Sequence, residues 1–443
     1  MSVAPTSITQ QGAISLYAVD INTGDIVLSH HPRQRMTPAS LTKIMTTGAA
    51  LHILGDDYRY QTRFYLRRDV AGYSLYVLGG GDPTLGSSRF EGSKSKVLFR
   101  ELLSALQKAG VKSLNKLVID NTCYTGMQQP SKRLWEDMGN YYGAAPDGLT
   151  YRENTFHLEL QSPPQSGAPV RIVSVNPAVG VGFDCMVLSA DNKKDSAYIY
   201  GHPLMDTWQV SGTIPRNRTS FTIKGAMPHP GQVLARELKA YLSNSGITVG
   251  TIEKGKGMHA DHHQWLYTHY SPPLSSLIAV VNKKSHNLFA DHLLFSLAQT
   301  QGAAHWDKGV AALEQFWRDR IPDFSGTFYD GSGLSPFNAL AAVDMVAVLQ
   351  WLYQYDIKGV YKESLAVAGV DGTLRSILKD EAYQARVIGK SGSMNGVLAY
   401  CGYLTTNRGK TLAFCIMANH FTESYSEIRS NMEALMKQII VQN

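Results

Sequence analysis

Apolar and polar residues alternate near the start of the chain in the pattern of β-strands. Around the turn residues 22–25, this alternation predicts a hairpin over residues 12–29. Towards the C-terminus, strand-like apolar runs predict three strands at 387–389, 397–404 and 411–418, and helical spacing predicts a closing amphipathic helix at 432–441. The N-terminal hairpin and the C-terminal strands could therefore join in one sheet.

Apolar residues spaced three and four apart predict the helices. Thr37-Pro38-Ala39-Ser40 is a typical helix start, and helical spacing follows it. Further helices are predicted at 97–109, 233–244, 277–298, 308–318 and 342–353. Strands at 75–78 and 116–120 flank the helix at 97–109 in the order of one βαβ unit. Short strands broken by Pro, Gly and Asn make 155–223 a β-rich segment.

Composition narrows the class of protein. A length of 443 residues suggests about three domains, and the 44% of hydrophobic residues excludes a disordered or fibrous chain. No apolar run reaches the roughly 18 residues of a membrane span, and we expect no signal peptide. The net charge of +6 comes from scattered side chains, so we expect no nucleic-acid partner. The four cysteines form no CxxC pair, which excludes a zinc ribbon.

Residues 40–43 read Ser-Leu-Thr-Lys, an S-x-x-K motif at the predicted helix start. Residues i and i+3 share one helix face, so the Lys43 amine can reach the Ser40 hydroxyl. A serine hydroxyl is a weak nucleophile until a neighbouring base takes its proton, and a buried lysine can be that base. The motif alone is a weak signal, because 93–96 and 376–379 match it too. A helix-capping serine beside a surface lysine is the alternative interpretation.

Two further motifs change that balance. Ser285-His286-Asn287 is an S-x-N motif at a helix start, although S-x-N also occurs at Ser174 and Ser393. Lys390-Ser391-Gly392 is a K-[ST]-G motif on a predicted strand, and it occurs once. S-x-x-K, S-D-N and K-T-G together form the signature of β-lactamases and penicillin-binding proteins. Their appearance in this order is a strong signal.

On these motifs the chain resembles the low-molecular-mass class C penicillin-binding proteins, the DacB-like D-alanyl-D-alanine carboxypeptidase/endopeptidases. The resemblance runs along nearly the whole chain and includes five further segments, at 79–85, 141–144, 271–274, 330–335 and 369–374. Class A β-lactamases place the first two motifs far closer together. The long interval from Ser40 to Ser285 instead accommodates the two inserted modules that the family carries.

The resemblance implies an α/β (α+β) fold with a transpeptidase domain like that of the serine β-lactamases, an antiparallel sheet flanked by helices. Two nested modules would interrupt it. The implied boundaries are 1–60 plus 264–443 for the catalytic domain, 61–162 plus 216–263 for an inserted α/β domain, and 163–215 for an inserted β-rich domain.

The implied function is that of a serine D-Ala-D-Ala carboxypeptidase/DD-endopeptidase. It would act on peptidoglycan stem peptides through an acyl-enzyme on Ser40, and β-lactams would acylate it covalently. No cofactor and no metal are implied. The location would be periplasmic or otherwise extracytoplasmic, with at most peripheral association with membrane or cell wall.

The resemblance also assigns roles to the residues that match its motifs. Five residues would carry the chemistry: the nucleophile Ser40, its general base Lys43, the proton relay Ser285, the amide-holding Asn287 and the cation Lys390. Backbone N–H groups of Ser40 and Ser393 would form the oxyanion hole. Substrate binding would add Ser391, for the terminal carboxylate, with Gly392, Ser393 and Asn395 beside it, and Asp137.

Asp137 is the candidate for specificity. The family's pocket binds the free amine of a diamino acid through an acid that follows a tryptophan, and Trp135-Glu136-Asp137 matches that stretch. An arginine found in some members is replaced here by Pro336, and Asn395 could supply part of the pocket. His286 stands where the family often has Asp, and we expect it to face solvent rather than to take part in catalysis.

Other interpretations are weaker. The histidines of 259–263 could ligate a metal, although a solvated loop is the commoner role. Cys401 and Cys415 could face each other across a hairpin, as buried thiols rather than a disulfide. Two other functions stay open: a β-lactamase, for which no acid for deacylation is evident, and a catalytically inert protein that binds penicillin or peptidoglycan. A labelled penicillin distinguishes these functions. A carboxypeptidase should form a stable adduct, a β-lactamase should turn the drug over, and an inert protein should not react.

Overall fold

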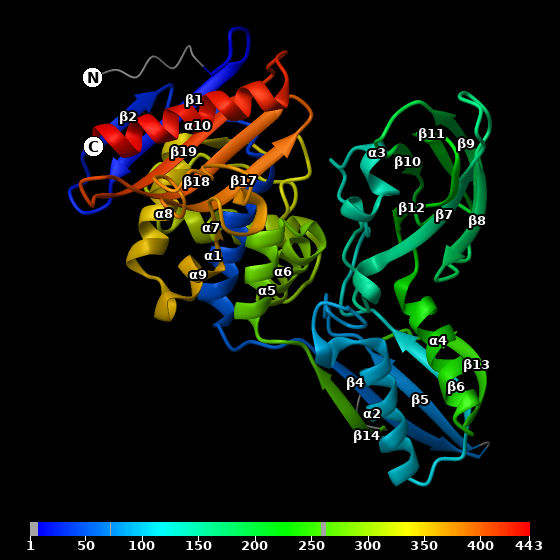
Figure 1. Cartoon of the computed structure of the whole chain (residues 1–443). Coiled ribbons are helices and arrows are strands. Elements are labelled where there is room, and N and C mark those ends of the chain that lie inside the picture. The colour runs from blue at the N-terminus through cyan, green and yellow to red at the C-terminus, as the bar shows by residue number, and fades with distance from the viewer. Residues whose placement is uncertain (1–7, 71, 258–262) are drawn as a thin grey trace. The chain divides into compact units, whose positions relative to one another are not determined.

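The computed structural model describes residues 8–70, 72–257 and 263–443, and Figure 1 shows their course. The chain divides into two compact units. Unit 1 consists of Met1–Tyr58 and Pro273–Asn443, and unit 2 consists of Arg59–Pro272. The finer division into three domains stays a prediction.

A six-stranded antiparallel sheet forms the centre of unit 1, in the order β16-β17-β18-β19-β1-β2. Its strands are β1 (Ala13–Asp20), β2 (Ile26–His30), β16 (Ala366–Val367), β17 (Val387–Met394), β18 (Val397–Thr405) and β19 (Thr411–Asn419). The N-terminal strand β1 pairs with β19 along its whole length, from Ala13 opposite Asn419 to Asp20 opposite Leu412. The expectation that both ends of the chain meet in one sheet is confirmed.

Helices cover both faces of this sheet (Figure 1). The C-terminal helix α10 packs on one face, where its apolar residues share a core with those of β1, β18 and β19. The other helices of unit 1 are α1 (Thr42–Leu54), α5 (Leu274–Lys284), α6 (Asn287–Gln299), α7 (Trp306–Arg318), α8 (Ala342–Gln354) and α9 (Val360–Ser364), and α10 is Tyr425–Gln442. A short ladder joins β3 (Arg35–Met36) to β15 (Leu340–Ala341). Helix α1 is buried along residues 42–51, which makes it the central helix of the unit.

One predicted element is wrong in a way that matters for the site. The single helix predicted over 277–298 is two helices, α5 and α6, with a break between them. Ser285 ends α5 in the left-handed region, with φ 56° and ψ 43°. The apolar spacing continues through the break, because both helices face the same core, so periodicity alone could not reveal it.

A five-stranded sheet in the order β13-β6-β5-β4-β14 forms one part of unit 2. Its strands are β4 (Gln61–Asp69), β5 (Gly72–Leu78), β6 (Ser113–Asp120), β13 (Thr248–Lys254) and β14 (Gln264–Tyr270), with helices α2 (Ser95–Lys108) and α4 (Pro230–Asn244). Strands β5 and β6 are parallel and α2 connects them, which confirms the βαβ unit.

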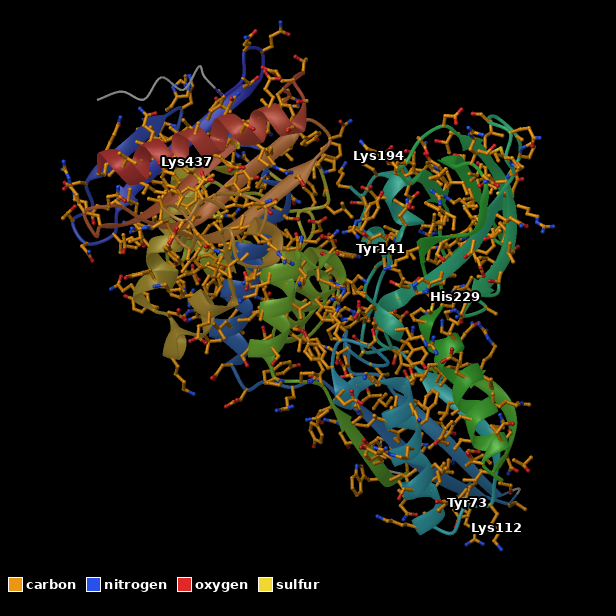
Figure 2. All side chains as sticks on the ribbon, in the orientation of Figure 1. Tyr73, Lys112, Tyr141, Lys194, His229 and Lys437 are labelled. Atoms are coloured by element: carbon orange, nitrogen blue, oxygen red, sulfur yellow. The ribbon has the colours of Figure 1, made fainter. Side chains whose placement is uncertain are left out.

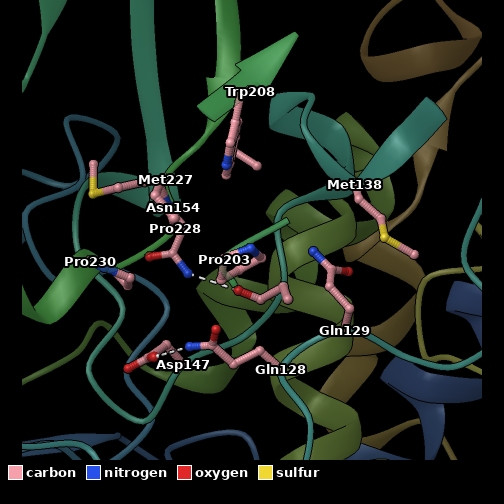
Figure 3. Close-up of a pocket in the computed structure, with 12 residues that line it drawn as sticks. Gln128, Gln129, Met138, Asp147, Asn154, Pro203, Trp208, Met227, Pro228 and Pro230 are labelled. Atoms are coloured by element: carbon pink, nitrogen blue, oxygen red, sulfur yellow. Dashed lines mark hydrogen bonds between the residues drawn. The ribbon is translucent and has the colours of Figure 1, made fainter. Parts of the chain in front are cut away.

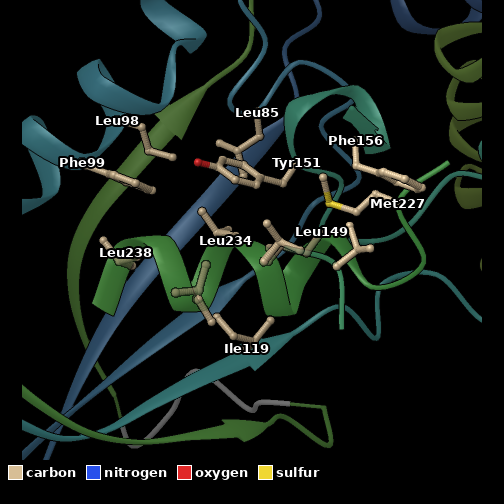
Figure 4. Close-up of a cluster of buried hydrophobic side chains, with 14 of the residues drawn as sticks. Leu85, Leu98, Phe99, Ile119, Leu149, Tyr151, Phe156, Met227, Leu234 and Leu238 are labelled. Carbon is tan, nitrogen blue, oxygen red and sulfur yellow. The ribbon is translucent and has the colours of Figure 1, made fainter. Parts of the chain in front are cut away.

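Two three-stranded sheets form the β-rich part of unit 2, in the orders β12-β7-β8 and β10-β11-β9. The strands are β7 (Thr155–Ser162), β8 (Arg171–Asn176), β9 (Gly182–Ala190), β10 (Ser196–Tyr200), β11 (Thr207–Pro215) and β12 (Arg218–Ala226), and α3 (Trp135–Met138) precedes them. A continuous buried cluster runs from α2 and α4 through Tyr151 to Phe156 on β7 (Figure 4). This β-rich segment was predicted and is confirmed.

Cys401 on β18 and Cys415 on β19 lie directly opposite each other in the ladder. Both are buried and free, as predicted, and burial raises the pKa of the Cys401 thiol to about 12. They are therefore packing groups rather than reactive thiols. Cys123 and Cys185 are free as well.

Charged side chains are spread over the surface. In unit 2, for example, Lys112 lies by the five-stranded sheet and Lys194 by the β-rich part (Figure 2). Within the described ranges, every helix is too short or too polar to span a bilayer.

Candidate active site

Ser40 lies in a tight 3-10 turn, Ala39–Leu41, that leads directly into α1. The preceding residue, Ala39, has φ 47°, which is unusual for a residue with a side chain. Gly333 packs against this turn so closely that a Cβ there would lie 1.9 Å from the Ala39 carbonyl oxygen. The turn leaves Ser40 partly exposed at the beginning of a buried helix. Strained backbone of this kind is common at functional sites.

Lys43 joins the first two motifs. Its Nζ donates to Ser40 Oγ at 2.9 Å, to Asn287 Oδ1 at 2.7 Å and to the Ser332 carbonyl oxygen. The side chain is fully buried, although it carries an amine. Among the S-x-x-K matches, residues 40–43 are thus the one in which the lysine amine contacts the serine hydroxyl and the S-x-N asparagine together.

Lys390 joins the second and third motifs. From β17 its Nζ donates to Ser285 Oγ at 2.9 Å and to the Ser391 carbonyl oxygen at 2.6 Å. Burial holds the pKa of Lys390 well below its usual range, and the nearby charge of Lys43 lowers it further. The site therefore contains two buried, electrostatically coupled amines, each hydrogen-bonded to a serine hydroxyl.

Gly392 brings β17 against the turn that carries Ser40. A Cβ at this position would lie 2.7 Å from the Pro38 carbonyl oxygen and 3.1 Å from the Ser40 backbone nitrogen. Only glycine therefore allows the strand to approach this closely. Ser391 is half-buried beside it, while Ser393 and Asn395 are exposed near the end of the strand.

The outer edge of β17 is open beside Ser40. Strand β16 pairs only with residues 388 and 389, and among the described residues no strand pairs with this edge over 390–394. An open edge offers backbone N–H and C=O groups to an extended peptide.

The loop 330–335 is part of the site, and its contact was missed from sequence. Its Ser332 carbonyl accepts from Lys43. The buried Asp330 carboxylate holds the loop by accepting from the backbone N–H groups of Gly333 and Ser335, both at 2.8 Å, and Asp291 on α6 accepts from Gly331 N at 3.0 Å. An Asp within a Gly- and Ser-rich segment was the available signal. It indicates a tight loop, but not the amine that the loop contacts.

His286, the middle residue of S-x-N, caps helix α6. Its Nδ1 accepts from Phe289 N at 3.4 Å, and its ring lies 4.2 Å from the Phe289 ring. The side chain is half-buried rather than fully solvent-facing.

Asp137 lies in unit 2, in the first turn of the short helix α3, and is 8% exposed. Trp135 and Glu136 beside it are exposed. Burial and a hydrogen bond to the Asp137 carboxylate raise the pKa of Tyr142, which lies five residues further on. Asp137 thus has a local partner within unit 2.

A pocket in unit 2 lies beside the same helix, lined by Met138, Trp208 and several polar side chains (Figure 3). Its acid, Asp147, already accepts from Gln128 Nε2 at 2.7 Å and Asn121 Nδ2 at 3.0 Å. Its carboxylate is therefore already hydrogen-bonded within unit 2. In the described part of the chain no group of three His, Cys, Asp or Glu residues could hold a metal ion. The histidine stretch considered above lies largely at 259–262, outside the described residues.

Two serine–lysine pairs beside an open edge of an antiparallel sheet define a serine peptidase of the penicillin-binding class. The sequence profile of the D-Ala-D-Ala carboxypeptidase 3 (S13) family matches residues 6–439, and the chain belongs to this family. It is a serine-type D-Ala-D-Ala carboxypeptidase, a hydrolase, as its motifs predicted.

Known relatives cover nearly the whole chain. It is 28% identical over 431 residues to the D-alanyl-D-alanine carboxypeptidase of Actinomadura sp. (strain R39), covering 92% of this chain and 78% of that protein. It is 26% identical over 439 residues to the D-alanyl-D-alanine carboxypeptidase DacB of Haemophilus influenzae, covering 96% of this chain and 89% of that protein. The crystal structure of penicillin binding protein 4 (dacB) from H. influenzae matches with a TM-score of 0.86 at 25% identity, over 98% of both chains. The predicted fold is confirmed.

Proposed function

We propose that Ser40 is the nucleophile of this carboxypeptidase and that Lys43 is its general base. The observation that carries the proposal is the contact of Lys43 Nζ with Ser40 Oγ at 2.9 Å. A base must lie within hydrogen-bond reach of the proton that it takes, and this pair does.

The other partners of Lys43 support that role. Asn287 Oδ1 and the Ser332 carbonyl oxygen only accept hydrogen bonds. A neutral amine has two N–H groups and one lone pair. When the two N–H groups point to these oxygens, the lone pair is left facing Ser40 Oγ. Asn287 and the 330–335 loop would thus orient the base.

The second serine–lysine pair suits the leaving group. Ser40 Oγ would form a bond to the scissile carbonyl carbon, and the bond from that carbon to the D-Ala nitrogen would break. The proton taken from Ser40 by Lys43 would reach the leaving nitrogen through the Ser285 hydroxyl, which Lys390 holds at 2.9 Å. Water would then hydrolyse the acyl-enzyme.

The open edge of β17 suits an extended peptide. Backbone N–H groups of Ser40 and Ser393 would stabilise the oxyanion, at about 3 kcal/mol of barrier for each donor. The Ser391 hydroxyl, with the positive charge of Lys390 nearby, would bind the terminal carboxylate of the substrate. Asn395 and Asp137 would contribute to recognition of the side chain.

The substrate proposed is the D-Ala-D-Ala stem peptide of peptidoglycan, with cross-linked peptides as a second substrate. The H. influenzae relative of solved structure is called a penicillin-binding protein, and we propose that β-lactams acylate Ser40 at the same site as the peptide substrate. Action on the cell wall places the enzyme in the periplasm or otherwise outside the cytoplasm, with at most peripheral association with membrane or wall.

Labelled penicillin tests this function. We expect a stable adduct on the peptide that contains residues 39–43, and Ser40→Ala should abolish it while thermal unfolding stays unchanged. Label on Ser93 or Ser376 would contradict the assignment. Rapid turnover of the drug would indicate a β-lactamase, and absence of any adduct would indicate an inert site.

A further inference from the structure

Asp371 contacts two separate elements of unit 1 through its two carboxylate oxygens. Oδ1 accepts from the backbone N–H of Val367 at 2.8 Å. Oδ2 accepts from Lys283 Nζ, also at 2.8 Å. One side chain therefore links β16 to the last turn of α5.

Each of these contacts leads directly to a residue of the site. Lys283 precedes Ser285 by two residues, at the end of α5. Val367 pairs with Ile388 on β17, two residues before Lys390. Asp371 therefore connects the backbone that carries Ser285 to the strand that carries Lys390, the two residues whose side chains meet at 2.9 Å.

The backbone around Asp371 is packed against the same two elements. At Gly372, with φ 57°, a Cβ would lie 2.7 Å from the Lys283 carbonyl oxygen and 2.7 Å from the Ala366 Cβ. The turn thus lies between α5 and β16 without space for a larger residue. This close contact supports the carboxylate contacts and restricts the distance between the two elements.

Ser285 needs such support, because it has a left-handed backbone conformation that residues with a side chain rarely adopt. Strained conformations persist only where the surroundings determine them. The pKa of Asp371 also favours an ion pair. Burial raises it, but the hydrogen bonds from Lys283 and Val367, with the charges of Lys283 and Lys284, lower it overall, so the carboxylate is ionised at neutral pH.

We propose that Asp371 is a positioning residue that, through its pair with Lys283 and its bond to β16, holds the Ser285 hydroxyl against Lys390. The proposal rests on the role proposed above for Ser285 and Lys390 in proton transfer. Asp371 itself contacts neither of these side chains in the structure, and it acts through the two elements that carry them.

The test separates the two contacts of Asp371 in the full-length protein. Asp371→Asn keeps an oxygen that can accept from Val367 but removes the charge that pairs with Lys283, and Lys283→Met removes the other member of the pair. Because small displacements of catalytic groups cost large factors in rate, we expect each change to slow acylation of Ser40 by labelled penicillin about tenfold. With a D-Ala-D-Ala peptide, kcat should fall and KM should stay nearly constant. Lys283→Arg, which keeps the positive charge that Lys283→Met removes, should acylate at close to the native rate.

Two controls distinguish positioning from general stability. Asp380→Asn breaks the ion pair of Asp380 with Lys437, elsewhere in unit 1, and should leave acylation unchanged. In a Ser285→Ala background, Asp371→Asn should cause no further loss, because its effect passes through Ser285.

The proposal is overturned if Asp371→Asn and Lys283→Met acylate at the native rate. It is also overturned if Asp371→Asn slows the Ser285→Ala protein by the same factor as the native protein, or if Asp380→Asn is equally slow. If Asp371→Asn fails to fold, Lys283→Met with its Lys283→Arg control decides the matter. Failure of the proposed function is a separate result, since the native protein would then carry no label on Ser40.

Discussion

Both units bury charged side chains, and the two buried lysines of unit 1 contrast with three buried acids of unit 2 in the contacts that hold them. In unit 1 Lys43 reaches Asn287 and Ser332, which lie 244 and 289 residues away. Lys390 reaches Ser285 across 105 residues. These contacts form only when the whole unit has folded.

In unit 2 three buried acids each shape the turn that follows them, although Asp120 Oδ2 also accepts from the distant Gly257 N at 3.1 Å. Each of the three accepts from the backbone N–H two residues further on: Asp82 from Thr84, Asp120 from Thr122 and Asp147 from Leu149. Such bonds shape the local turn. Burial of a charge therefore does not by itself indicate catalysis. Partners from distant segments are the better indication.

The largest expected effect tests the distant contacts of Lys43. Lys43→Arg keeps the charge but cannot act as a base at ordinary pH. Acylation of Ser40 should therefore fall about 10²- to 10⁴-fold, measured as the rate of labelling by penicillin. The matched change Lys410→Arg, at an exposed lysine of the same unit, should leave the rate unchanged. A near-native rate for Lys43→Arg would reduce Lys43 to a structural cation.

A change in the core of unit 2 tests whether the chemistry depends on unit 1 alone. Phe156 is fully buried, with its ring 5.6 Å from that of Phe183 and 6.2 Å from that of Trp208. Phe156→Ala should destabilise unit 2 by about 3–5 kcal/mol, measured by amide hydrogen exchange in β7 and α4. Below its unfolding transition, penicillin should still acylate Ser40 at the native rate. Val173→Ala, at an exposed position on β8, should change the stability of unit 2 little. Slower acylation by the folded Phe156→Ala protein would show that the chemistry does not depend on unit 1 alone.

Asp82 is a buried acid with local hydrogen bonds, and it should make the stability of unit 2 depend on pH. Its Oδ2 has no hydrogen-bond partner, and burial raises the pKa of Asp82 from 3.8 to about 6, against the bonds from Thr84 that lower it. The folded state therefore binds the proton more tightly than the unfolded state. The contribution of Asp82 to stability is full below about pH 4 and is lost as the pH rises through about 6, by roughly 2–3 kcal/mol.

Asp82→Asn should remove this dependence, since an amide does not titrate, and still offers an oxygen to Thr84. The measurement is the free energy of urea unfolding followed in unit 2 between pH 4 and pH 7. A variant with the same pH slope as the native protein would show that Asp82 is not the titrating group.

The smallest expected effect concerns Asp137, which combines burial with a local partner but is proposed to bind substrate. A charge-assisted contact with the free amine of a diamino acid is worth roughly 1.5–3 kcal/mol. Asp137→Ala should therefore lower kcat/KM about ten- to a hundredfold for peptides with that amine. Acetylated D-Ala-D-Ala peptides and penicillin should be nearly unaffected, and the exposed neighbour changed in Glu136→Ala should have no such selectivity. Equal losses with every substrate would limit Asp137 to shaping its own turn with Tyr142.

The sequence alone determined the elements and the three motifs of the site. Strand β1 follows from alternation, strands β18 and β19 from continuous apolar runs, the helix after Ser40 from its proline-bounded start, and the βαβ unit from the order of its elements. These features are predictable because periodicity and motif spacing are local properties of the chain. The residue roles and the three-domain division remain predictions.

Only the tertiary structure decided which of the S-x-x-K and S-x-N matches form the site. The break at Ser285 depends on packing that a continuous apolar pattern conceals, and the Ser332 carbonyl was missed because every residue has one. The lowered pKa of Lys390 depends on burial and on Lys43, which is remote in sequence. Contacts between distant segments arise from the folded sheet and its helices together, and no local pattern of residues records them.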